Sequence, residues 1–570
     1  MRAAAVIGLA LLSLLSATAG LGARAATARA PAERQAGRIA VVGAYADIQG
    51  GFNLALACCN GEQNAYFEAG VLRGAFVQNS RSVWVKDLVS SAAATTRGVT
   101  YTIRKDAFWY WGGRRIPVTY RDFVYTLRQI DDPQSDVADR EGYANLDPTR
   151  FTHDGDRRVT FFWRTTNCST DFPCGPFADW QALFSQLYPS FALHDLDFNK
   201  LWTSCICGSD GKPVSDGPFY LTRYTPGQAV VLKANPYFYE KARLAEVDFE
   251  IIGSDPAVQT EAISDGQVDL IDPSFTPDVL PLRSVAGLAY QVAPSYALEQ
   301  LEIREGSARG GPSVTKGGSN VLLRAPWMRQ AIMLALDRQS MIDQVYGPGT
   351  GLKPVDDLLY FPGEAGYRPD LGRWNHDPAK AIAILRKHCT GGPTAPAPQT
   401  TRVWRCDGLP ASFQYTWPSI PARTIIEQVA KADLKAVGIA IVDRPVPGSV
   451  LFGPDGPFGG GFDLTEFADF TSGDPGDWFD QYRCFGDQNI TGYCSHIVDT
   501  LLRDANGELD PTKRRALVER ADAGMATEVP VIPLFQKPGV VVHKSSLLGV
   551  VPNPGTDGPF WNIQDWHWKR

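Results

Sequence analysis

The sequence predicts a protein of the α/β class that contains more than one folding unit. Its 570 residues allow three or four units at roughly 150 residues per domain. Strand and helix signals alternate along the chain without an internal repeat. Hydrophobic residues make up 44% of the chain and charged residues 21%, which provides the apolar surface for packed cores and excludes intrinsic disorder for most of the chain.

The charge balance argues against a nucleic-acid partner. The chain has 55 Lys and Arg residues against 62 Asp and Glu residues, a formal net charge of -7. Nucleic-acid binding proteins need a basic surface to neutralise phosphates. No such surface is expected here.

Residues 1–30 predict a secretory signal peptide. An apolar stretch from Ala3 to Ala19 follows Arg2, and it is too short and too rich in small residues for a membrane span. Small-x-small cleavage signals follow, of which the last ends at Ala30. The first cysteine is Cys58, so no lipid-attachment cysteine is in place. We therefore expect export to the periplasm or the outside of the cell without a lipid anchor.

The ten cysteines of an exported chain predict disulfides rather than metal ligands, because the compartment beyond the membrane is oxidising. Three pairs bracket short loops, and closing such a loop stabilises the fold by about 2 to 3 kcal/mol. The three predicted pairs are Cys168 with Cys174, Cys389 with Cys406, and Cys484 with Cys494.

The other four cysteines form two tight clusters, Cys58-Cys59 and Cys205-x-Cys207. Adjacent or near-adjacent cysteines pair with each other only under strain, so we expect cross-pairing between the clusters. The alternative is a zinc site made of Cys168, Cys174, Cys205 and Cys207. Its C-x5-C and C-x-C spacings depart from the usual C-x2-C knuckles, and we expect no metal.

Individual elements follow from local patterns, in chain order. Gly98 to Arg104 alternates with the two-residue period of a half-buried strand. Thr119 then caps a helix whose third residue is Asp122. The helix has an apolar face formed by Phe123, Val124, Leu127 and Ile130.

Asp-Pro pairs predict the starts of two later helices, in which Asp caps the helix and Pro occupies its first turn. The pairs are Asp377-Pro378 and Asp510-Pro511. A further helix has an apolar stripe that stops at Gly438, a residue suited to end a helix. The residues of this stripe are Ile425, Val429, Ala432 and Ala436.

Several blocks, taken together and in order, resemble the family 5 extracellular solute-binding proteins of bacterial ABC importers for peptides. No single block identifies the family, but the order and spacing of the blocks do. The resemblance spans about residues 38–570. The blocks are Tyr101–Arg104, Phe108–Gly112, Pro117–Val124, Ser215–Tyr220, Lys233–Tyr237, Gly266–Asp269, Met328–Arg338, Asp474-Pro475, Gly492-Tyr493, Val498–Leu502 and Asp510–Arg514.

The resemblance implies a two-lobed periplasmic-binding-protein fold of the large family 5 type. Such a fold has an extra subdomain in the first lobe, a chain that crosses between the lobes twice, and a ligand cleft between them. We expect the first lobe at residues 38–274, with residues 531–570 returning to it, and the second lobe at residues 275–530.

The same resemblance implies a binding protein rather than an enzyme. It would capture peptides, with oligopeptides favoured, by closing its lobes, and would deliver them to permease subunits in the membrane. Neither a cofactor nor a nucleic-acid partner is expected, and we expect a monomer. In physical terms the ligand binds the closed form better than the open form and so raises the fraction of molecules that are closed.

The charged partners of a small peptide are altered in this sequence. The family usually places an Asp three positions before the Asp-Pro of the second lobe, where it meets the peptide's α-ammonium, and that position aligns with Thr471. Asp469 lies two residues earlier and would point to the same side in a strand. Dipeptide binders place an Arg for the ligand carboxylate at the position of Thr416. Enclosing a terminal charge without its partner is costly, which disfavours a strict dipeptide but leaves longer peptides or an uncharged solute such as an oligosaccharide.

Aromatic side chains near these positions are candidates for the walls of the cleft, since rings give large contact area for few lost rotors. Core packing is the competing explanation for each ring. The candidates are Tyr415, Trp417, Phe467 and Phe470, together with Tyr296 near the crossover.

A secreted hydrolase is the alternative of a different class. The sequence has no Gly-x-Ser-x-Gly, His-Glu-x-x-His or Gly-x-x-x-x-Gly-Lys-Ser/Thr motif, which removes the common hydrolase, zincin and nucleotide-binding signatures. An enzyme would need a carboxylate pair instead. The available residues are Asp463, Asp469, Asp474 and Asp477, which are better explained as turn and cap residues.

Overall fold

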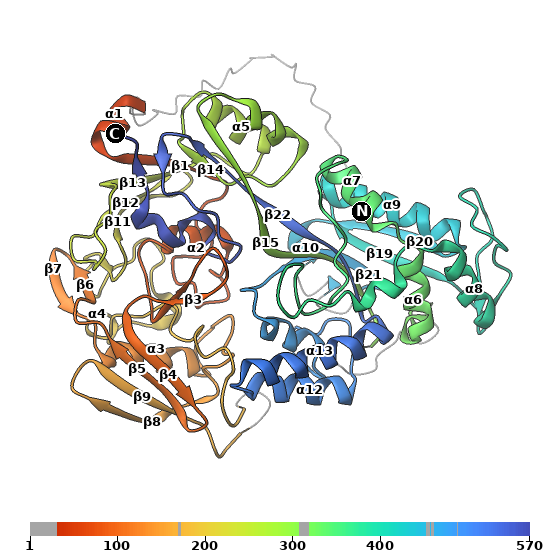
Figure 1. Cartoon of the computed structure of the whole chain (residues 1–570), viewed down its shortest axis with the longest axis horizontal. Helices are drawn as coiled ribbons and strands as arrows, with labels where there is room; N and C mark the ends of the chain where they lie inside the picture. Colours follow the sequence, from red (N-terminus) through yellow and green to blue (C-terminus); the bar gives the residue numbers. More distant parts are fainter. Residues whose placement is uncertain (1–30, 169–172, 307–318, 452–455, 458–460, 487) are drawn as a thin grey trace, which may run out of the picture.

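One sheet of ten strands runs through two α/β lobes (Figure 1). The computed structural model describes residues 31–168, 173–306, 319–451, 456–457, 461–486 and 488–570. The predicted signal peptide lies outside these ranges. The strand order is β11-β12-β13-β1-β14-β22-β15-β21-β19-β20. In that order the strands are Phe219–Thr225, Ala229–Ala234, Glu246–Ile251, Ile39–Ala44, Leu270–Ile271, Val531–Lys544, Leu288–Ile303, Leu464–Phe470, Ser412–Pro418 and Ala440–Val446.

The two longest strands of this sheet, β15 and β22, carry the chain between the lobes. They pair antiparallel over almost their full lengths, and β15 also pairs with β21 while β22 pairs with β14. Their ladder is irregular in the middle, where the register shifts between Pro294, opposite Pro538, and Leu298, opposite Gln536. Proline donates no backbone hydrogen bond, so the ladder is interrupted at this point.

The first lobe holds β11 to β14 with β1, and a separate four-stranded sheet beside them (Figure 1). This second sheet has the order β4-β5-β9-β8 and corresponds to the expected extra subdomain. Its strands are Val89–Thr95, Gly98–Ile103, Arg158–Trp163 and Leu146–Asp154. The predicted strand is confirmed as β5, and the predicted helix as α3, Tyr120–Asp131. At the start of α3 the Thr119 N–H donates to Asp122 Oδ2 over 2.9 Å.

The second lobe packs helices against β19, β20 and β21, and the helix starts predicted from the Asp-Pro pairs are confirmed. Asp377 accepts a hydrogen bond from Lys380 N, and Asp510 accepts one from Thr512 N. Among the described residues, no helix is both long and apolar enough to cross a membrane. The helices are α6 (Pro326–Ala335), α7 (Arg338–Tyr346), α8 (Pro378–His388), α9 (Pro421–Ala436), α12 (His496–Gly507) and α13 (Pro511–Glu528).

The helix predicted before Gly438 exists as α9, but its predicted buried face is wrong in part. Ala432 is exposed. The buried apolar residues are Ile426, Val429, Ala430 and Leu434. The larger side chains of Ile426 and Leu434 remove more apolar area from water than alanines do, and they set the rotation of the helix against the sheet.

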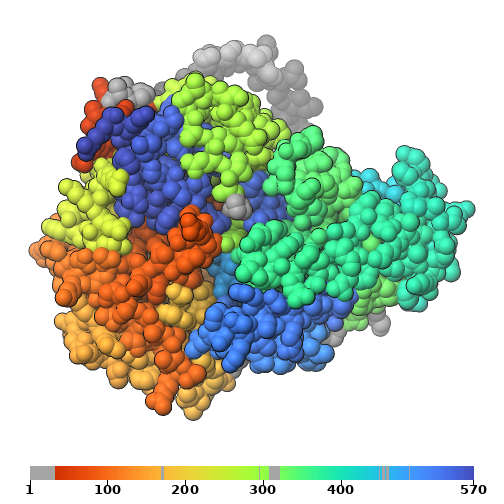
Figure 2. All heavy atoms as spheres, in the orientation of Figure 1, coloured from red at the N-terminus to blue at the C-terminus, as the bar shows by residue number. Residues whose placement is uncertain are grey.

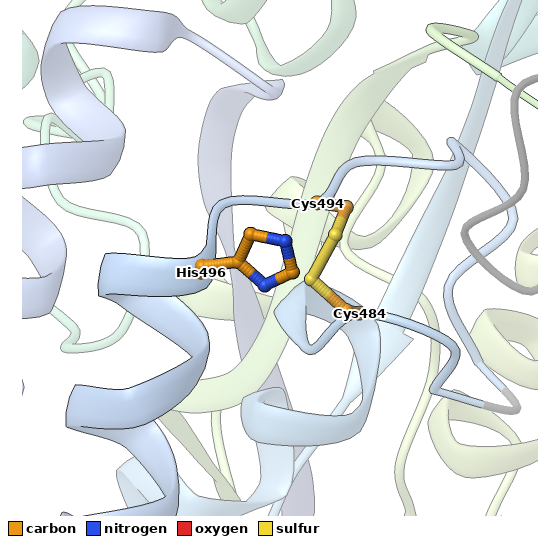
Figure 3. A group of neighbouring side chains, drawn as sticks. All are labelled: Cys484, Cys494 and His496. Atoms are coloured by element: carbon orange, nitrogen blue, oxygen red, sulfur yellow. A yellow bond between two sulfur atoms is a disulfide. The ribbon is translucent and has the colours of Figure 1, made fainter.

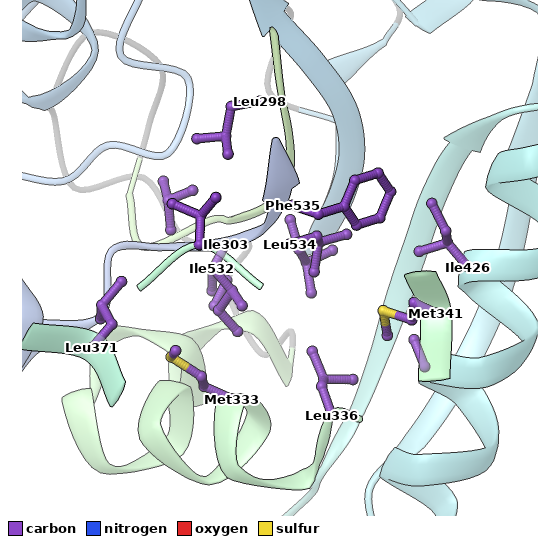
Figure 4. Close-up of a cluster of buried hydrophobic side chains, with 14 of the residues drawn as sticks. Leu298, Ile303, Met333, Leu336, Met341, Leu371, Ile426, Ile532, Leu534 and Phe535 are labelled. Atoms are coloured by element: carbon purple, nitrogen blue, oxygen red, sulfur yellow. The ribbon is translucent and has the colours of Figure 1, made fainter. Parts of the chain in front are cut away.

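The second-lobe core forms where α6, α7 and α9 meet β15 and β22 (Figure 4). Arg338, the last residue of the block Met328–Arg338, is only 3% exposed and connects several segments of this region. Its guanidinium donates to the carbonyl of Pro533 over 2.7 Å and pairs with Asp356 over 2.6 Å. The side chains in Figure 4 include Leu298, Ile303, Met333, Leu336, Met341, Ile426, Ile532, Leu534 and Phe535.

All three short disulfides predicted from loop spacing are formed. The predicted cross-pairing of the other four cysteines is wrong, because Cys58 bonds to Cys59 and Cys205 bonds to Cys207. The Cα atoms of Cys205 and Cys207 lie 5.4 Å apart, inside the usual range for a disulfide, so the local backbone already brings these two residues together. With all four of its cysteines in disulfides, the alternative zinc site has no thiolate ligands.

Two large hydrophobic clusters contain most of the buried apolar residues of the described chain, and a third, small one lies around Phe467 and Ile490. One large cluster contains residues between 40 and 270 together with residues between 541 and 568, and the other contains residues between 262 and 542 with Val41. The clusters overlap in sequence around α5 (Pro256–Ser264) and along β22. The lobe boundaries given above stay a prediction.

The first described helix, α1 (Pro31–Gly37), is held to the first lobe by a buried ion pair. Arg34 lies 3.3 Å from Asp269, and their side chains are 2% and 1% exposed. Arg34 also donates to the carbonyl oxygens of Gly266 and Gln267, just after α5. The ion pair therefore connects the start of the described chain to the family-like block at Gly266–Asp269.

We expect Arg34→Ala to lower the free energy of unfolding by about 3 to 5 kcal/mol, since it leaves the Asp269 carboxylate buried without its cation. Arg38→Ala, four residues later on an exposed side chain, is the matched control and should change it by less than about 0.5 kcal/mol. Urea titration of both variants tests this. Equal losses in the two variants would contradict the assignment.

Candidate ligand-binding site

A small pocket lies in the second lobe at the point where β21 ends. Its volume is ≈50 Å³, enough for one charged group but not for a whole peptide. Four of the predicted residues line it, namely Phe467, Asp469, Phe470 and Thr471. The remaining lining residues come from β15, the turn η7 (Pro475–Trp478), the helix α11 (Phe479–Tyr482) and the segment after it; they are Glu302, Asp477, Trp478, Gln481, Gln488 and Ile490.

A larger hollow of ≈640 Å³ lies elsewhere, on the outside of the first lobe. It is lined by Glu33 and Gly37 of α1 and by residues of neighbouring strands. No second-lobe residue lines it, and it adjoins the start of the described chain. It does not bear on a site between the lobes.

Four polar side chains form a connected network beside the pocket. Glu302 Oε1 accepts hydrogen bonds from Gln300 Nε2 over 2.8 Å and from Gln481 Nε2 over 2.6 Å. The same Gln300 amide donates to Asp469 Oδ2 over 2.5 Å. Glu302 Oε2 has no hydrogen-bond partner among the described residues, and Glu302 is 0% exposed. One amide therefore bridges two carboxyl groups, one of which keeps an unused oxygen.

The carboxyl groups at the pocket hold their protons more tightly than usual. Burial raises the pKa of Asp469 to about 7; the Glu299 charge adds to the rise, and the Gln300 hydrogen bond and Arg423 oppose it. Burial and then the charge of Asp469 raise the pKa of Glu302 well above its ordinary value. A cation brought to the pocket would favour the ionised forms.

The remaining predicted site residues lie apart from the pocket. Tyr415, Thr416 and Trp417 lie in β19 and are 0%, 0% and 4% exposed, and they do not line the pocket. Tyr296 is also buried. It lies in the irregular middle of β15, where its hydroxyl donates to Ser82 Oγ of the first lobe. Its carbonyl accepts from Thr471 N over 2.9 Å, which places it between the pocket and the first lobe.

The two lobes touch each other directly, and Figure 2 shows the first lobe against the helices of the second. The Ala178 N–H donates to the Asn506 carbonyl over 2.8 Å, and the Asn506 side chain donates to Glu141 Oε1 over 3.0 Å. Gln78 Nε2 donates to the Ser472 carbonyl over 2.6 Å, near the pocket. Direct hydrogen bonds therefore join the two lobes in this structure.

Carboxyl groups from both lobes meet in this interface. Burial, followed by the charges of Asp139 and Asp477, raises the pKa of Glu141 to about 8. Burial also raises the pKa of Asp179, helped by Asp474 and Asp477 of the second lobe. Asp477 is an exposed residue, yet the surrounding protein, together with the charge of Asp474, raises its pKa to about 7. Closing the lobes thus brings like charges together.

Two arginines of the second lobe offset part of this charge. Arg514 pairs with both oxygens of Asp474, each over 2.6 Å. Arg483 pairs with Asp480 over 2.6 Å. Asp474 and Asp477 also accept backbone hydrogen bonds from Gly476 and Ser472, as expected for turn and cap residues.

One group of side chains has the spacing of metal ligands. The ligand atoms of Cys484, Cys494 and His496 lie within 4.8 Å of one another (Figure 3). The two sulfurs are joined in a disulfide, and a disulfide sulfur lacks the thiolate charge that binds metals. We therefore assign the group to the disulfide that closes this loop.

The sequence analysis missed Gln300, Glu302 and Gln481. A usable signal was present for Glu302, because the apolar residues Leu301 and Ile303 flank it. A carboxylate inside an apolar strand needs a partner. Gln481 had no comparable signal, since its position depends on how α11 packs against β15.

Comparison with known proteins identifies relatives over most of the chain. The family model of the bacterial extracellular solute-binding proteins, family 5, matches residues 84–489. The oligopeptide-binding protein OppA of Mycobacterium tuberculosis is 24% identical over 465 residues, which cover 79% of this chain and 71% of OppA. The di/tripeptide-binding protein 4 of Pseudomonas aeruginosa is 26% identical over 356 residues, covering 62% of this chain and 61% of the relative.

Solved structures share the fold. The periplasmic EDTA-binding protein EppA superposes with a TM-score of 0.78 at 21% identity, covering 93% of this chain and 96% of EppA. The oligopeptide-binding protein AppA from Bacillus subtilis, in complex with a nonapeptide, superposes with a TM-score of 0.70 at 18% identity, covering 93% of this chain and 99% of AppA. The family match and the shared two-lobed fold agree, and the chain belongs to the family 5 bacterial extracellular solute-binding proteins of ABC transporters.

Proposed function

We propose that this protein captures peptides outside the cytoplasm, closes its lobes around them and delivers them to the permease of an ABC importer. The observation that carries the proposal is the carboxyl-lined pocket at the end of β21, beside the contact between the lobes. Relatives named as oligopeptide-binding and di/tripeptide-binding proteins support the peptide class.

Asp469 is the proposed partner of the peptide's α-ammonium. The usual carboxylate position aligns with Thr471, which has no charge to offer, and both residues line the same pocket. A pocket of ≈50 Å³ fits the ammonium group, and the rest of the peptide would lie between the lobes. Phe470 is 56% exposed and would supply an apolar wall. The hydrogen bond from Tyr296 to Ser82 of the first lobe would form when the lobes close.

The other predicted aromatic residues have a supporting role in this proposal. Tyr415 and Trp417 pack in the core of the second lobe, so they would hold β19 in place rather than touch the ligand. We propose capture without turnover, by an exported monomer that needs no cofactor.

Protein purified from its natural host should carry an intact solute. Native mass spectrometry should show a mass excess that disappears on unfolding and reappears as a peptide in the released fraction. Incubation with a peptide library should leave every member uncleaved. A released oligosaccharide, or the time-dependent appearance of cleavage products, would contradict the proposed function.

Without ligand, the closed form should lose stability as pH rises. The pKa of Glu141 is raised to about 8 and that of Asp477 to about 7 in the closed form, whereas separated lobes would return both groups toward their ordinary values near 4. Protonation therefore favours closure fully only below about pH 4, and this contribution is lost progressively as the pH rises from there to about 7 to 8.

Small-angle scattering at pH 5.5 and pH 8.5 measures this effect. The radius of gyration of the empty protein should be larger at pH 8.5. Asp477→Asn should reduce the difference, whereas Asp443→Asn, an exposed residue of β20 paired with Lys431, should not. Identical radii at the two pH values would contradict the interpretation.

A further inference from the structure

Strands β15 and β21 carry carboxylates on both faces of the sheet, and only one face supplies cations. On the face covered by α9, Arg423 lies 2.9 Å from Glu299 and 3.3 Å from Glu466. Lys537 lies 3.9 Å from Glu299 on the same side. These buried acids are therefore compensated within the protein.

The opposite face has acids but no such partner. Residues two apart in a strand share a face, and diagonal cross-strand neighbours lie within reach of each other. Glu302 and Gln300 therefore share the side of Asp469, whose pairing partner on β15 is Leu298. Across the described residues, Glu302, Asp469 and Asp477 form no ion pair with Lys, Arg or His.

The unused Glu302 oxygen points to a missing ligand group. Glu302 is 0% exposed, lines the pocket, and leaves Oε2 without a hydrogen-bond partner. A buried carboxylate oxygen without a donor is unfavourable. A ligand cation in the pocket would supply both the donor and the opposite charge.

The arginines nearby are already engaged, Arg514 by Asp474 and Arg483 by Asp480. The first lobe adds Asp139, Glu141 and Asp179 on the other side of the interface. A neutral ligand would leave this excess of negative charge in place when the lobes close. A cationic ligand would reduce the repulsion between the lobes and thereby favour closure.

We propose that the ligand is a small solute with at least two positive charges, such as a peptide whose first residues are Lys or Arg, with one charged group in the pocket against Glu302 and Asp469 and another beside the exposed Asp477. This inference rests on the proposed capture function and narrows its substrate class. It also predicts discrimination against polyanionic solutes.

Isothermal titration at pH 8 with three C-terminally amidated tetrapeptides tests the charge preference. Lys-Lys-Ala-Ala should bind with a dissociation constant about tenfold or more below that of Ala-Ala-Ala-Ala, and Glu-Glu-Ala-Ala should bind more weakly than both. Spermidine, as a fourth probe, separates a requirement for peptide from one for charge alone.

Glu302→Gln preserves the shape of the side chain and removes its charge. The ratio of dissociation constants for the alanine and lysine peptides should fall toward 1 in this variant. Asp443→Asn, on the same lobe but outside the pocket, is the matched control and should keep the ratio of the unmodified protein.

The pH dependence of the ratio provides a test that needs no variant. Asp469 and Asp477 ionise near pH 7, so the preference for the lysine peptide should be larger at pH 8.5 than at pH 5.5. The charged groups that act on Asp469 are Glu302 and Tyr482 on its own side and Glu299 and Arg423 across the sheet; those that act on Asp477 are Asp139, Glu141, Asp179 and Asp474.

The outcomes separate this inference from the proposed function. Equal affinities for the lysine and alanine peptides would overturn the charge preference and leave peptide capture standing. Binding of spermidine without any peptide would support the preference for cations and contradict peptide capture. No binding of any of the four probes would contradict both.

Discussion

The pairing of β15 with β22 is the constraint on which the rest of the molecule depends. These strands are the only neighbours that join the two halves of the ten-stranded sheet in the described chain. On one side β22 pairs with β14 of the first lobe, and on the other β15 pairs with β21 of the second. Any movement of one lobe relative to the other must therefore bend or twist this pair. The interruption near Pro294 and Pro538 gives the pair a natural place to bend.

The position of the pocket follows from the same strands. Tyr296 lies at the interruption and contacts Ser82 of the first lobe, whereas Gln300 and Glu302 follow it on β15 and meet Asp469 on β21. The residues that would hold a ligand are thus a few positions from the point where the lobes move. A charged group bound at Glu302 would therefore lie close to the part of β15 that must bend when the lobes close.

The sequence predicted the fold well because its signals are local and repeated. The strand at Gly98, the cap at Thr119 and the Asp-Pro helix starts each depend on a few neighbouring residues, and the three short disulfides depend on loop length. The face of α9 was partly mispredicted because apolar periodicity ignores side-chain size. The pairing of Cys58 with Cys59 and of Cys205 with Cys207 was mispredicted because avoidance of strain was given more weight than local proximity.

The candidate site was harder to predict, because its network is not local. Asp469, Phe470 and Thr471 could be placed by their position before Asp474-Pro475. Gln300, Glu302 and Gln481 come together only when β15, β21 and α11 pack. Tyr415, Thr416 and Trp417 were predicted from the family resemblance at Thr416, yet all three are buried in β19. A resemblance alone cannot separate a ring that faces a ligand from one that packs in the core.

The most direct test of this account is the distance between the lobes in solution. Spin labels on Asp154→Cys in the first lobe and Lys513→Cys in the second, both exposed positions, would report that distance by pulsed electron paramagnetic resonance. The account predicts a long and broad distribution for the empty protein at pH 8.5, and a shorter and narrower one when a bound cationic peptide closes the lobes. One unchanged distribution in both samples would contradict it.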